Sequence, residues 1–279
     1  MTTKTHVTKH RFLDVDGINV FYREAGDPNA PKLLLLHGFP SASHQYARLI
    51  EELKDDFHIV APDHPGSGHT EVPGERHYTF DFLADTVEKF LEKLNFTGFT
   101  MYVFDFGAPV GFRVATRHPE WVEGLVVQNG NAYEDGLSEL AKAFVGNRDP
   151  EYARSLLALE YTKFGYVEGA RDPESISPHT WTLDQHYLDL RPQPQVDLFL
   201  DYHNNVAQYP KWQTYLREHR PPTLITWGKG DPFFLEPGAR AYLRDVPDAQ
   251  LHLLDTGHFA LEEDLTEIAG LIREFAARR

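Results

Sequence analysis

The sequence predicts an α/β protein in which a mostly parallel sheet is covered by helices on both faces. Short apolar runs of strand length alternate with amphipathic stretches of helix length, which is the pattern of such a sheet. A chain of 279 residues is long enough for one domain of this kind with an insertion. The alternation stops after Asn131 and resumes at Pro222, which indicates where the insertion lies.

The first half of the chain predicts an opening hairpin at residues 11–25, because Asp16-Gly17 separates two β-rich segments. Residues 33–36 and 57–61 are apolar runs that end at His37 and Pro62. The other elements expected in this half are a helix at 43–53, an amphipathic helix at 78–94, a strand at 100–104, a helix at 111–116 and a strand at 124–128.

Residues 134–216 predict a helical cap, because they contain helix-like pieces, many aromatic residues and little strand signal. Strands are expected again at 222–227 and 249–254, and a terminal helix at 261–277. The predicted organisation is therefore a core formed by residues 1–133 and 217–279, with the cap at 134–216 between its two parts.

Three reactive side chains follow predicted strands, at the edge of a parallel sheet where ligands bind. Asp105 follows the strand 100–104 and precedes a sharp glycine-rich turn, while Asp231 and His258 come just past the last two strands. Singly, each has an ordinary interpretation as a helix cap or a turn residue. In the order nucleophile, acid and base they predict a catalytic triad, in which His258 activates water and Asp231 orients the imidazole.

A carboxylate at the nucleophile position changes the expected chemistry. An aspartate attacks an sp³ carbon and leaves an alkyl-enzyme ester, which water must then cleave. The segment His37-Gly38-Phe39-Pro40 follows an earlier strand and predicts a loop that supplies a backbone donor to an oxyanion hole. We expect the N–H groups of Phe39 and Phe106 to form the donor pair.

The chain resembles the epoxide hydrolase and haloalkane dehalogenase branch of the α/β-hydrolase superfamily over essentially its whole length. The segments that carry the resemblance are HGFP (37–40), PDHPGSGHT (62–70), VFDFGAPVG (103–111), WGKGDPFF (227–234) and DTGHFALEE (255–263). It implies an α/β-hydrolase fold with a mostly parallel eight-stranded sheet and a helical cap inserted after the sixth strand. It also places the triad acid at Asp231, because the tip Gln128-Asn129 has no carboxylate; Glu134 and Asp135 are more distant alternatives.

Within this branch, the groups that stabilise the leaving atom distinguish the reactions. An epoxide needs a proton donor, and in the family cap tyrosines serve. Tyr202 is the first candidate, because residues 199–204 resemble the late-cap segment that carries such a tyrosine. The resemblance further implies a substrate pocket that includes His37, Tyr161, Tyr166 and Trp181, with Tyr161 or Tyr166 as the partner of Tyr202. We expect His44 and His203 to be structural.

The resemblance favours an epoxide hydrolase that forms diols. Haloalkane dehalogenases typically carry Trp after the nucleophile as a halide donor, and fluoroacetate-type dehalogenases carry Arg there, whereas this chain has Phe106. Phe106 also departs from epoxide hydrolases, which commonly have Trp. A haloalkane or haloacid dehalogenase remains the alternative, since Trp181 offers one donor. An ester or lactone hydrolase and a non-catalytic binding module on the same fold are further alternatives.

The composition limits the partners. A net charge of −15, from 27 Lys and Arg against 42 Asp and Glu, argues against binding to nucleic acids or to anionic membranes. The chain has no cysteine, which excludes disulfides and a thiolate nucleophile. The N-terminal residues are polar and no apolar run could span a bilayer, so we expect a cytoplasmic protein. The expected ligand is a small apolar organic substrate, without metal or cofactor, on a monomer or homodimer.

Overall fold

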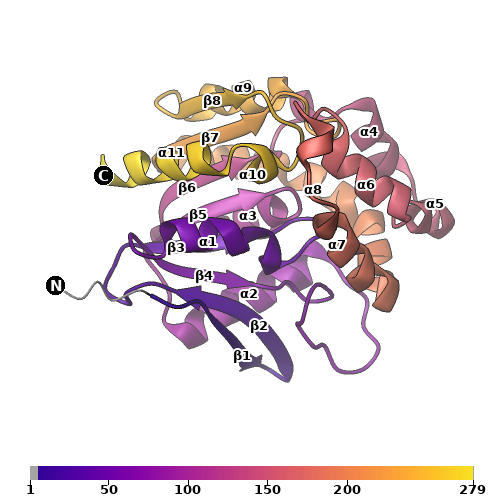
Figure 1. Ribbon diagram of the computed structural model, residues 1–279, viewed down its shortest axis with the longest axis horizontal. Coiled ribbons are helices and arrows are strands. Elements are labelled where there is room, and N and C mark those ends of the chain that lie inside the picture. Colours follow the sequence, from indigo (N-terminus) through magenta and orange to yellow (C-terminus); the bar gives the residue numbers. More distant parts are fainter. Residues whose placement is uncertain (1–5, 279) are drawn as a thin grey trace.

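The computed structural model describes residues 6–278, which contain one eight-stranded sheet (Figure 1). The strand order is β1-β2-β4-β3-β5-β6-β7-β8; β2 is antiparallel to β1 and β4, and all other neighbours are parallel. The predicted mostly parallel sheet and its opening hairpin are confirmed. The strands are β1 Lys9–Val15, β2 Ile18–Ala25, β3 Lys32–Leu36, β4 His58–Pro62, β5 Phe99–Phe104, β6 Val122–Gln128, β7 Thr223–Gly228 and β8 Gln250–Leu254.

Successive strand residues point to opposite faces of the sheet. Both faces are apolar here, and helices cover both. In β3, Leu33 and Leu35 pack in the apolar cluster that contains α1 (Ala47–Leu53), α10 (Ala260–Glu263) and α11 (Leu265–Ala277). Leu34 and Leu36 pack in the cluster that contains α2 (Phe80–Leu94), α3 (Gly107–Arg117) and α9 (Glu236–Asp245). Each face of the sheet therefore has its own hydrophobic core.

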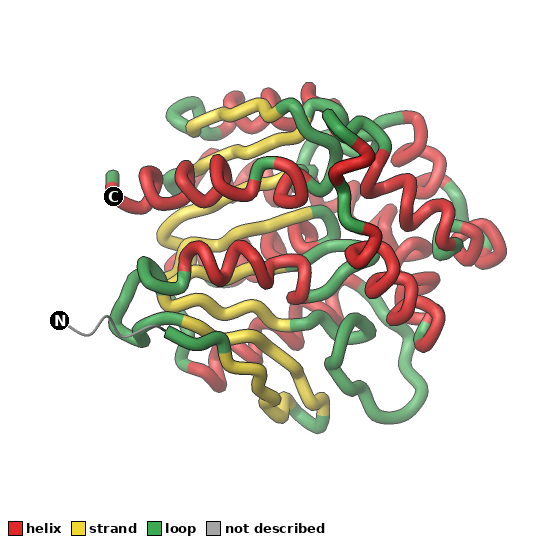
Figure 2. The backbone as a smooth tube through the Cα atoms, viewed as in Figure 1, coloured by secondary structure: helices red, strands yellow, loops and turns green. Residues whose placement is uncertain are grey.

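Five helices between β6 and β7 gather at one end of the sheet, on the right of Figures 1 and 2. They are α4 Glu139–Gly146, α5 Pro150–Ser155, α6 Leu159–Val167, α7 Pro178–Leu190 and α8 Pro192–His219. The predicted cap, residues 134–216, contains these helices except for the end of α8. No helix within residues 6–278 combines the length and the apolar character needed to cross a membrane.

Three local details differ from the expectations. Helix α3 begins at Gly107 rather than at residue 111, because the turn at Asp105 is tighter than the sequence indicates. The terminal helix is divided at Asp264 into α10 and α11. The helix expected at 43–53 begins with a 3₁₀ turn, η1 Ser43–Tyr46. Further 3₁₀ turns are η2 Pro119–Trp121, η3 Glu134–Gly136 and η4 Pro173–Ser175.

Candidate active site

Asp105 lies in a tight turn between β5 and α3. Its φ angle is 46°, in the left-handed region that residues other than glycine rarely adopt. Gly107 permits the turn, because a Cβ there would come within 2.1 Å of the Leu36 carbonyl oxygen. The N–H of Ala108 donates to the Asp105 carbonyl over 3.0 Å and closes the turn. This strand–turn–helix arrangement presents the carboxylate at the end of the sheet that faces the cap.

The two oxygens of the Asp105 carboxylate have different surroundings. The N–H of Phe39 donates to Oδ1 over 2.6 Å, and the N–H of Phe106 is a second backbone donor to the carboxylate. Oδ2 lies 3.7 Å from Nε2 of His258. Amide donors therefore hold one oxygen as they would hold the carbonyl oxygen of an ester, and the other oxygen faces the histidine.

Asp231 orients His258 from the opposite side of the imidazole. Its Oδ2 accepts a hydrogen bond of 2.7 Å from Nδ1 of His258. Its Oδ1 accepts from the N–H groups of Phe233 and Phe234 over 2.7 and 3.0 Å. Asp231, and neither Glu134 nor Asp135, is thus the carboxylate that the structure brings to His258.

Asn129 is a site residue that the sequence analysis missed. It follows β6 with a φ angle of 45°, and its Nδ2 donates to Oδ2 of Asp231 over 2.7 Å. Its Oδ1 accepts from the N–H of Gly228 over 3.0 Å, which fixes the amide group. The missing carboxylate at the tip of β6 was noted from the sequence. The sequence feature that could have identified Asn129 is its residue type, because asparagine tolerates the left-handed conformation at a strand end.

Burial shifts the pKa values of both acid–base groups. Burial raises the pKa of Asp105 to about 6, although the charge of His258 and two backbone donors act in the opposite direction. Burial alone would lower the pKa of His258, but the charge and hydrogen bond of Asp231 outweigh it and raise that pKa above its ordinary value. Asp105 is therefore ionised at neutral pH and lies beside a histidine with increased proton affinity.

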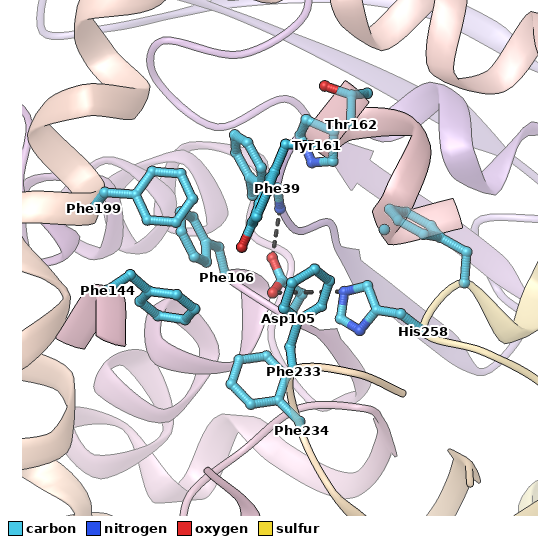
Figure 3. A pocket seen from close by; sticks show the side chains of 13 residues that line it. Phe39, Asp105, Phe106, Phe144, Tyr161, Thr162, Phe199, Phe233, Phe234 and His258 are labelled. Atoms are coloured by element: carbon cyan, nitrogen blue, oxygen red, sulfur yellow. Dashed lines mark hydrogen bonds and ion pairs between the residues drawn. The ribbon is translucent and has the colours of Figure 1, made fainter. Parts of the chain in front are cut away.

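A small apolar cavity lies next to Asp105 (Figure 3). The volume open to the centre of a water molecule is about 30 Å³, roughly two to three times the minimum that holds one water. A cavity of this character suits a small apolar molecule. Aromatic rings dominate its lining, from Phe39, Phe106, Phe144, Phe199, Phe233, Phe234 and Phe259.

Helix α6 contributes Tyr161, Thr162 and Gly165 to the pocket. The hydroxyl of Tyr161 points into the pocket on the side of Asp105 (Figure 3), and it has no hydrogen-bond partner within residues 6–278. Burial and the charge of Asp105 raise the pKa of Tyr161, so the hydroxyl stays protonated. Thr162 instead hydrogen-bonds with Oε1 of Gln185 over 2.9 Å. Tyr161 is therefore the neutral O–H donor of this pocket.

Tyr202, the first candidate drawn from the sequence, does not line the pocket. Its ring packs against Phe106 and Phe144, with centroid distances of 5.5 and 5.1 Å, and its hydroxyl hydrogen-bonds with Tyr209. Phe199, three positions earlier on α8, lines the pocket instead. Both residues are buried, and only the packing of α8 decides which of them reaches Asp105.

Three other expected pocket residues lie outside the lining. The hydroxyl of Tyr166 donates to Asp184 over 2.5 Å, and Trp181 packs near Tyr166 with a centroid distance of 6.2 Å. Nε2 of His37 accepts from the N–H of His64, and burial lowers the pKa of His37 to about 4. Hydrogen bonds and packing thus occupy these side chains away from the pocket.

The remaining histidines named from the sequence are also outside the pocket lining. His44 pairs with Asp184 over 2.7 Å, and Nδ1 of His203 bonds to the Leu200 carbonyl over 3.0 Å. In the part of the chain that the structure describes, no group of three or more histidine, aspartate or glutamate side chains is arranged to hold a metal ion.

Known proteins resemble this chain in sequence and in fold. The family model described as alpha/beta hydrolase fold matches residues 31–265. The chain is 40% identical over 274 residues to a protein of Saccharomyces cerevisiae named as an uncharacterized hydrolase, covering 93% of this chain and 94% of the yeast protein. It is 32% identical over 260 residues to epoxide hydrolase 3 of Mus musculus, covering 87% and 70% of the two chains.

Other relatives are named haloalkane dehalogenase and cis-3-alkyl-4-alkyloxetan-2-one decarboxylase. Among solved structures, Cfl2 of Burkholderia cenocepacia superimposes with a TM-score of 0.82 at 25% identity, over 96% of this chain and 95% of that one. The fold, the family match and these relatives together show that the chain is a hydrolase and belongs to the α/β-hydrolase family.

Proposed function

We propose that this hydrolase opens small epoxides to diols through a covalent ester on Asp105. In the first step, Oδ2 of Asp105 attacks a ring carbon of the epoxide and the carbon–oxygen bond breaks. The electron pair stays on the leaving oxygen, which takes the proton of Tyr161. The product of this step is an alkyl ester of Asp105 that carries a free hydroxyl.

In the second step, His258 removes a proton from water as the water oxygen adds to Cγ of the ester. The Cγ–Oδ2 bond then breaks, and the diol leaves with Oδ2 and one proton of the water. The other proton returns to Tyr161, and Asp105 keeps the oxygen of the water. The N–H groups of Phe39 and Phe106 stabilise the charge that develops on Oδ1.

The observation that carries this proposal is the two-sided environment of the Asp105 carboxylate. Oδ1 accepts from Phe39 over 2.6 Å, whereas Oδ2 lies 3.7 Å from the imidazole of His258. The same donors that hold Oδ1 in the carboxylate would hold the ester carbonyl. They would also stabilise the tetrahedral intermediate that water creates, so one geometry serves both steps.

An epoxide fits the pocket better than an alkyl halide. A departing alkoxide needs a proton, which the Tyr161 hydroxyl can donate into the cavity. A departing halide needs N–H donors, but Phe106 has no side-chain donor. No tryptophan lies among the described residues that line the pocket, and Trp181 is outside it.

A strained lactone is the second candidate substrate. It is favoured by one observation, the 28% identity to a protein of Shewanella oneidensis named cis-3-alkyl-4-alkyloxetan-2-one decarboxylase, over 96% of this chain and 88% of the relative. A four-membered lactone also carries ring strain and a carbon that a carboxylate can attack.

A turnover screen distinguishes these functions. The purified protein is incubated separately with styrene oxide, 1,2-epoxyhexane, 1-bromobutane, fluoroacetate and oxetan-2-one. Diol release, halide release and lactone loss are measured under one set of conditions. We expect diol formation to exceed the other rates. Halide release or lactone loss that is faster than diol formation would overturn the assignment to epoxides.

A further inference from the structure

Gly165 is the residue of α6 that lines the pocket without a side chain. It is buried and lies in the last turns of the helix, four positions after Tyr161. Residues four positions apart lie on the same side of a helix, about 6 Å apart along its axis. Glycine within a helix destabilises it relative to alanine, so its presence here needs a reason.

Neither usual structural reason for a glycine applies at this position. The backbone of Gly165 is helical and not in the left-handed region. A Cβ at Gly165 would lie 3.5 Å from Phe233 and 3.9 Å from Phe259, which are ordinary van der Waals distances. Gly169 shows the contrast: its φ angle is 72°, and a Cβ there would come within 1.7 Å of the Gly230 carbonyl oxygen.

A Cβ at Gly165 would lie in the cavity. Both side chains that it would contact, Phe233 and Phe259, line the same pocket as Gly165. The ring of Phe233 also packs edge-on against His258, with a centroid distance of 5.2 Å. The space beside Gly165 is therefore bounded by apolar rings on the side of the catalytic base.

We propose that Gly165 determines specificity, because the space beside it receives the apolar substituent of the substrate. The Tyr161 hydroxyl defines the end of the pocket where the leaving oxygen is protonated, and Gly165 lies one helical turn further along. A terminal epoxide with a short unbranched alkyl substituent matches this arrangement. The substrate class rests on the proposed function, whereas the apolar subsite does not.

Two matched variants test this inference, Gly165→Ala and Gly270→Ala. Gly270 lies inside α11, and a Cβ there would have no neighbour within 4 Å, so it provides the same helix change outside the pocket. We expect both variants to raise the melting temperature by about 2 °C. A lower melting temperature in Gly165→Ala alone would mean that the glycine is needed for packing, which would overturn the proposal.

Binding of 1-hexanol, a non-reacting probe, is measured by NMR titration for the wild type and both variants. The added methyl group overfills the subsite, so Gly165→Ala should bind 1-hexanol at least about tenfold more weakly than the wild type. Gly270→Ala should bind it equally well. Equal binding by all three proteins, or no binding by the wild type, would contradict the subsite.

The kinetic counterpart is the ratio of kcat/KM for 1,2-epoxyhexane to that for propylene oxide. This ratio should fall at least about tenfold in Gly165→Ala and stay unchanged in Gly270→Ala. An unchanged ratio in Gly165→Ala would overturn the specificity role. If the wild type forms no diol from either epoxide, the proposed function fails, and the 1-hexanol titration still decides the inference about Gly165.

Discussion

The sheet side and the cap side of the pocket differ in how firmly polar contacts hold their reactive groups. On the sheet side, Asp231 accepts hydrogen bonds from His258, Asn129 and two backbone N–H groups. On the cap side, the hydroxyl of Tyr161 has no partner within residues 6–278. Buried polar groups with all their partners specify one geometry, whereas an unpaired donor is free to serve a substrate.

This difference separates the two tasks of the site. In the proposed reaction, the groups that follow the strands carry out the acid–base steps, and their hydrogen bonds hold them in one arrangement. The cap contributes the unpaired hydroxyl of Tyr161 and an apolar surface that includes Phe144, Phe199 and Gly165. Changes on the sheet side should therefore abolish turnover of every substrate. Changes on the cap side should alter which substrates react and how their leaving atom is stabilised.

The largest effect is expected for Asp105→Asn. Asparagine tolerates the φ angle of 46° but cannot form the ester, so diol formation should fall about 10⁴-fold or more. Since burial raises the pKa of Asp105 to about 6, its ionisation destabilises the folded protein at neutral pH. The variant should gain on the order of 2 kcal/mol of unfolding free energy, measured by urea denaturation at pH 7.5.

Asp248→Asn provides the surface control for that comparison, because Asp248 is exposed and does not line the pocket. Neither its activity nor its stability should change measurably. A variant Asp105→Asn that keeps more than a few per cent of the wild-type rate would contradict the role of the carboxylate.

His258→Gln should block the second step and spare the first. Without the base, hydrolysis of the ester should slow about 10²- to 10⁴-fold. The protein should then accumulate with the mass of one bound epoxide, located at Asp105 by peptide mass spectrometry. Turnover of His258→Gln at the wild-type rate would contradict the role of His258 as the base. An adduct on another residue would contradict the role of Asp105 as the nucleophile.

Tyr161→Phe tests the cap side and should reduce kcat/KM for epoxides about 10²-fold, because the leaving oxygen loses its proton donor. Tyr202→Phe is the matched control, since Tyr202 is buried against Phe106 and does not line the pocket. Its activity should stay within about threefold of the wild type. A reversed result, with Tyr202→Phe inactive and Tyr161→Phe active, would restore the expectation drawn from the sequence.

The pH profile should reflect two groups with raised pKa values, Asp105 and His258, which must both be deprotonated. The rates should therefore fall as the pH is lowered. Asp105 attacks only when ionised, so kcat/KM should fall tenfold per pH unit below about 6. His258 must be neutral to activate water, and Asp231 raises its pKa. Where hydrolysis limits turnover, kcat should therefore decline at a higher pH than kcat/KM does. A profile that is flat between pH 5 and 8 would contradict both assignments.

The sequence predicts the sheet side well because its geometry follows from strands. A strand ends at a definable residue, and the ends of parallel strands share one edge, so Asp105, Asp231 and His258 could be placed together. Asn129 was overlooked because its contribution is a side-chain hydrogen bond to Asp231 across two strand ends, which residue spacing does not reveal.

The cap side was predicted less well because its helices are aromatic on several sides. Phe199 and Tyr202 are both buried on α8, and periodicity does not decide which of them faces the pocket. The prediction chose Tyr202 for its hydroxyl, but α8 packs so that Phe199 reaches the cavity. Gly165 gave no signal in the sequence, since its meaning depends on the rings opposite it.

The most direct test of covalent ester catalysis is a single turnover in H₂¹⁸O with enzyme in excess of 1,2-epoxyhexane. If water attacks Cγ of the ester, the ¹⁸O enters the carboxylate of Asp105, and the first diol released carries no label. Mass spectrometry of the peptide that contains Asp105 should therefore show the label. An unlabelled Asp105 with ¹⁸O in the diol would mean that water attacks the epoxide directly, which would contradict the account.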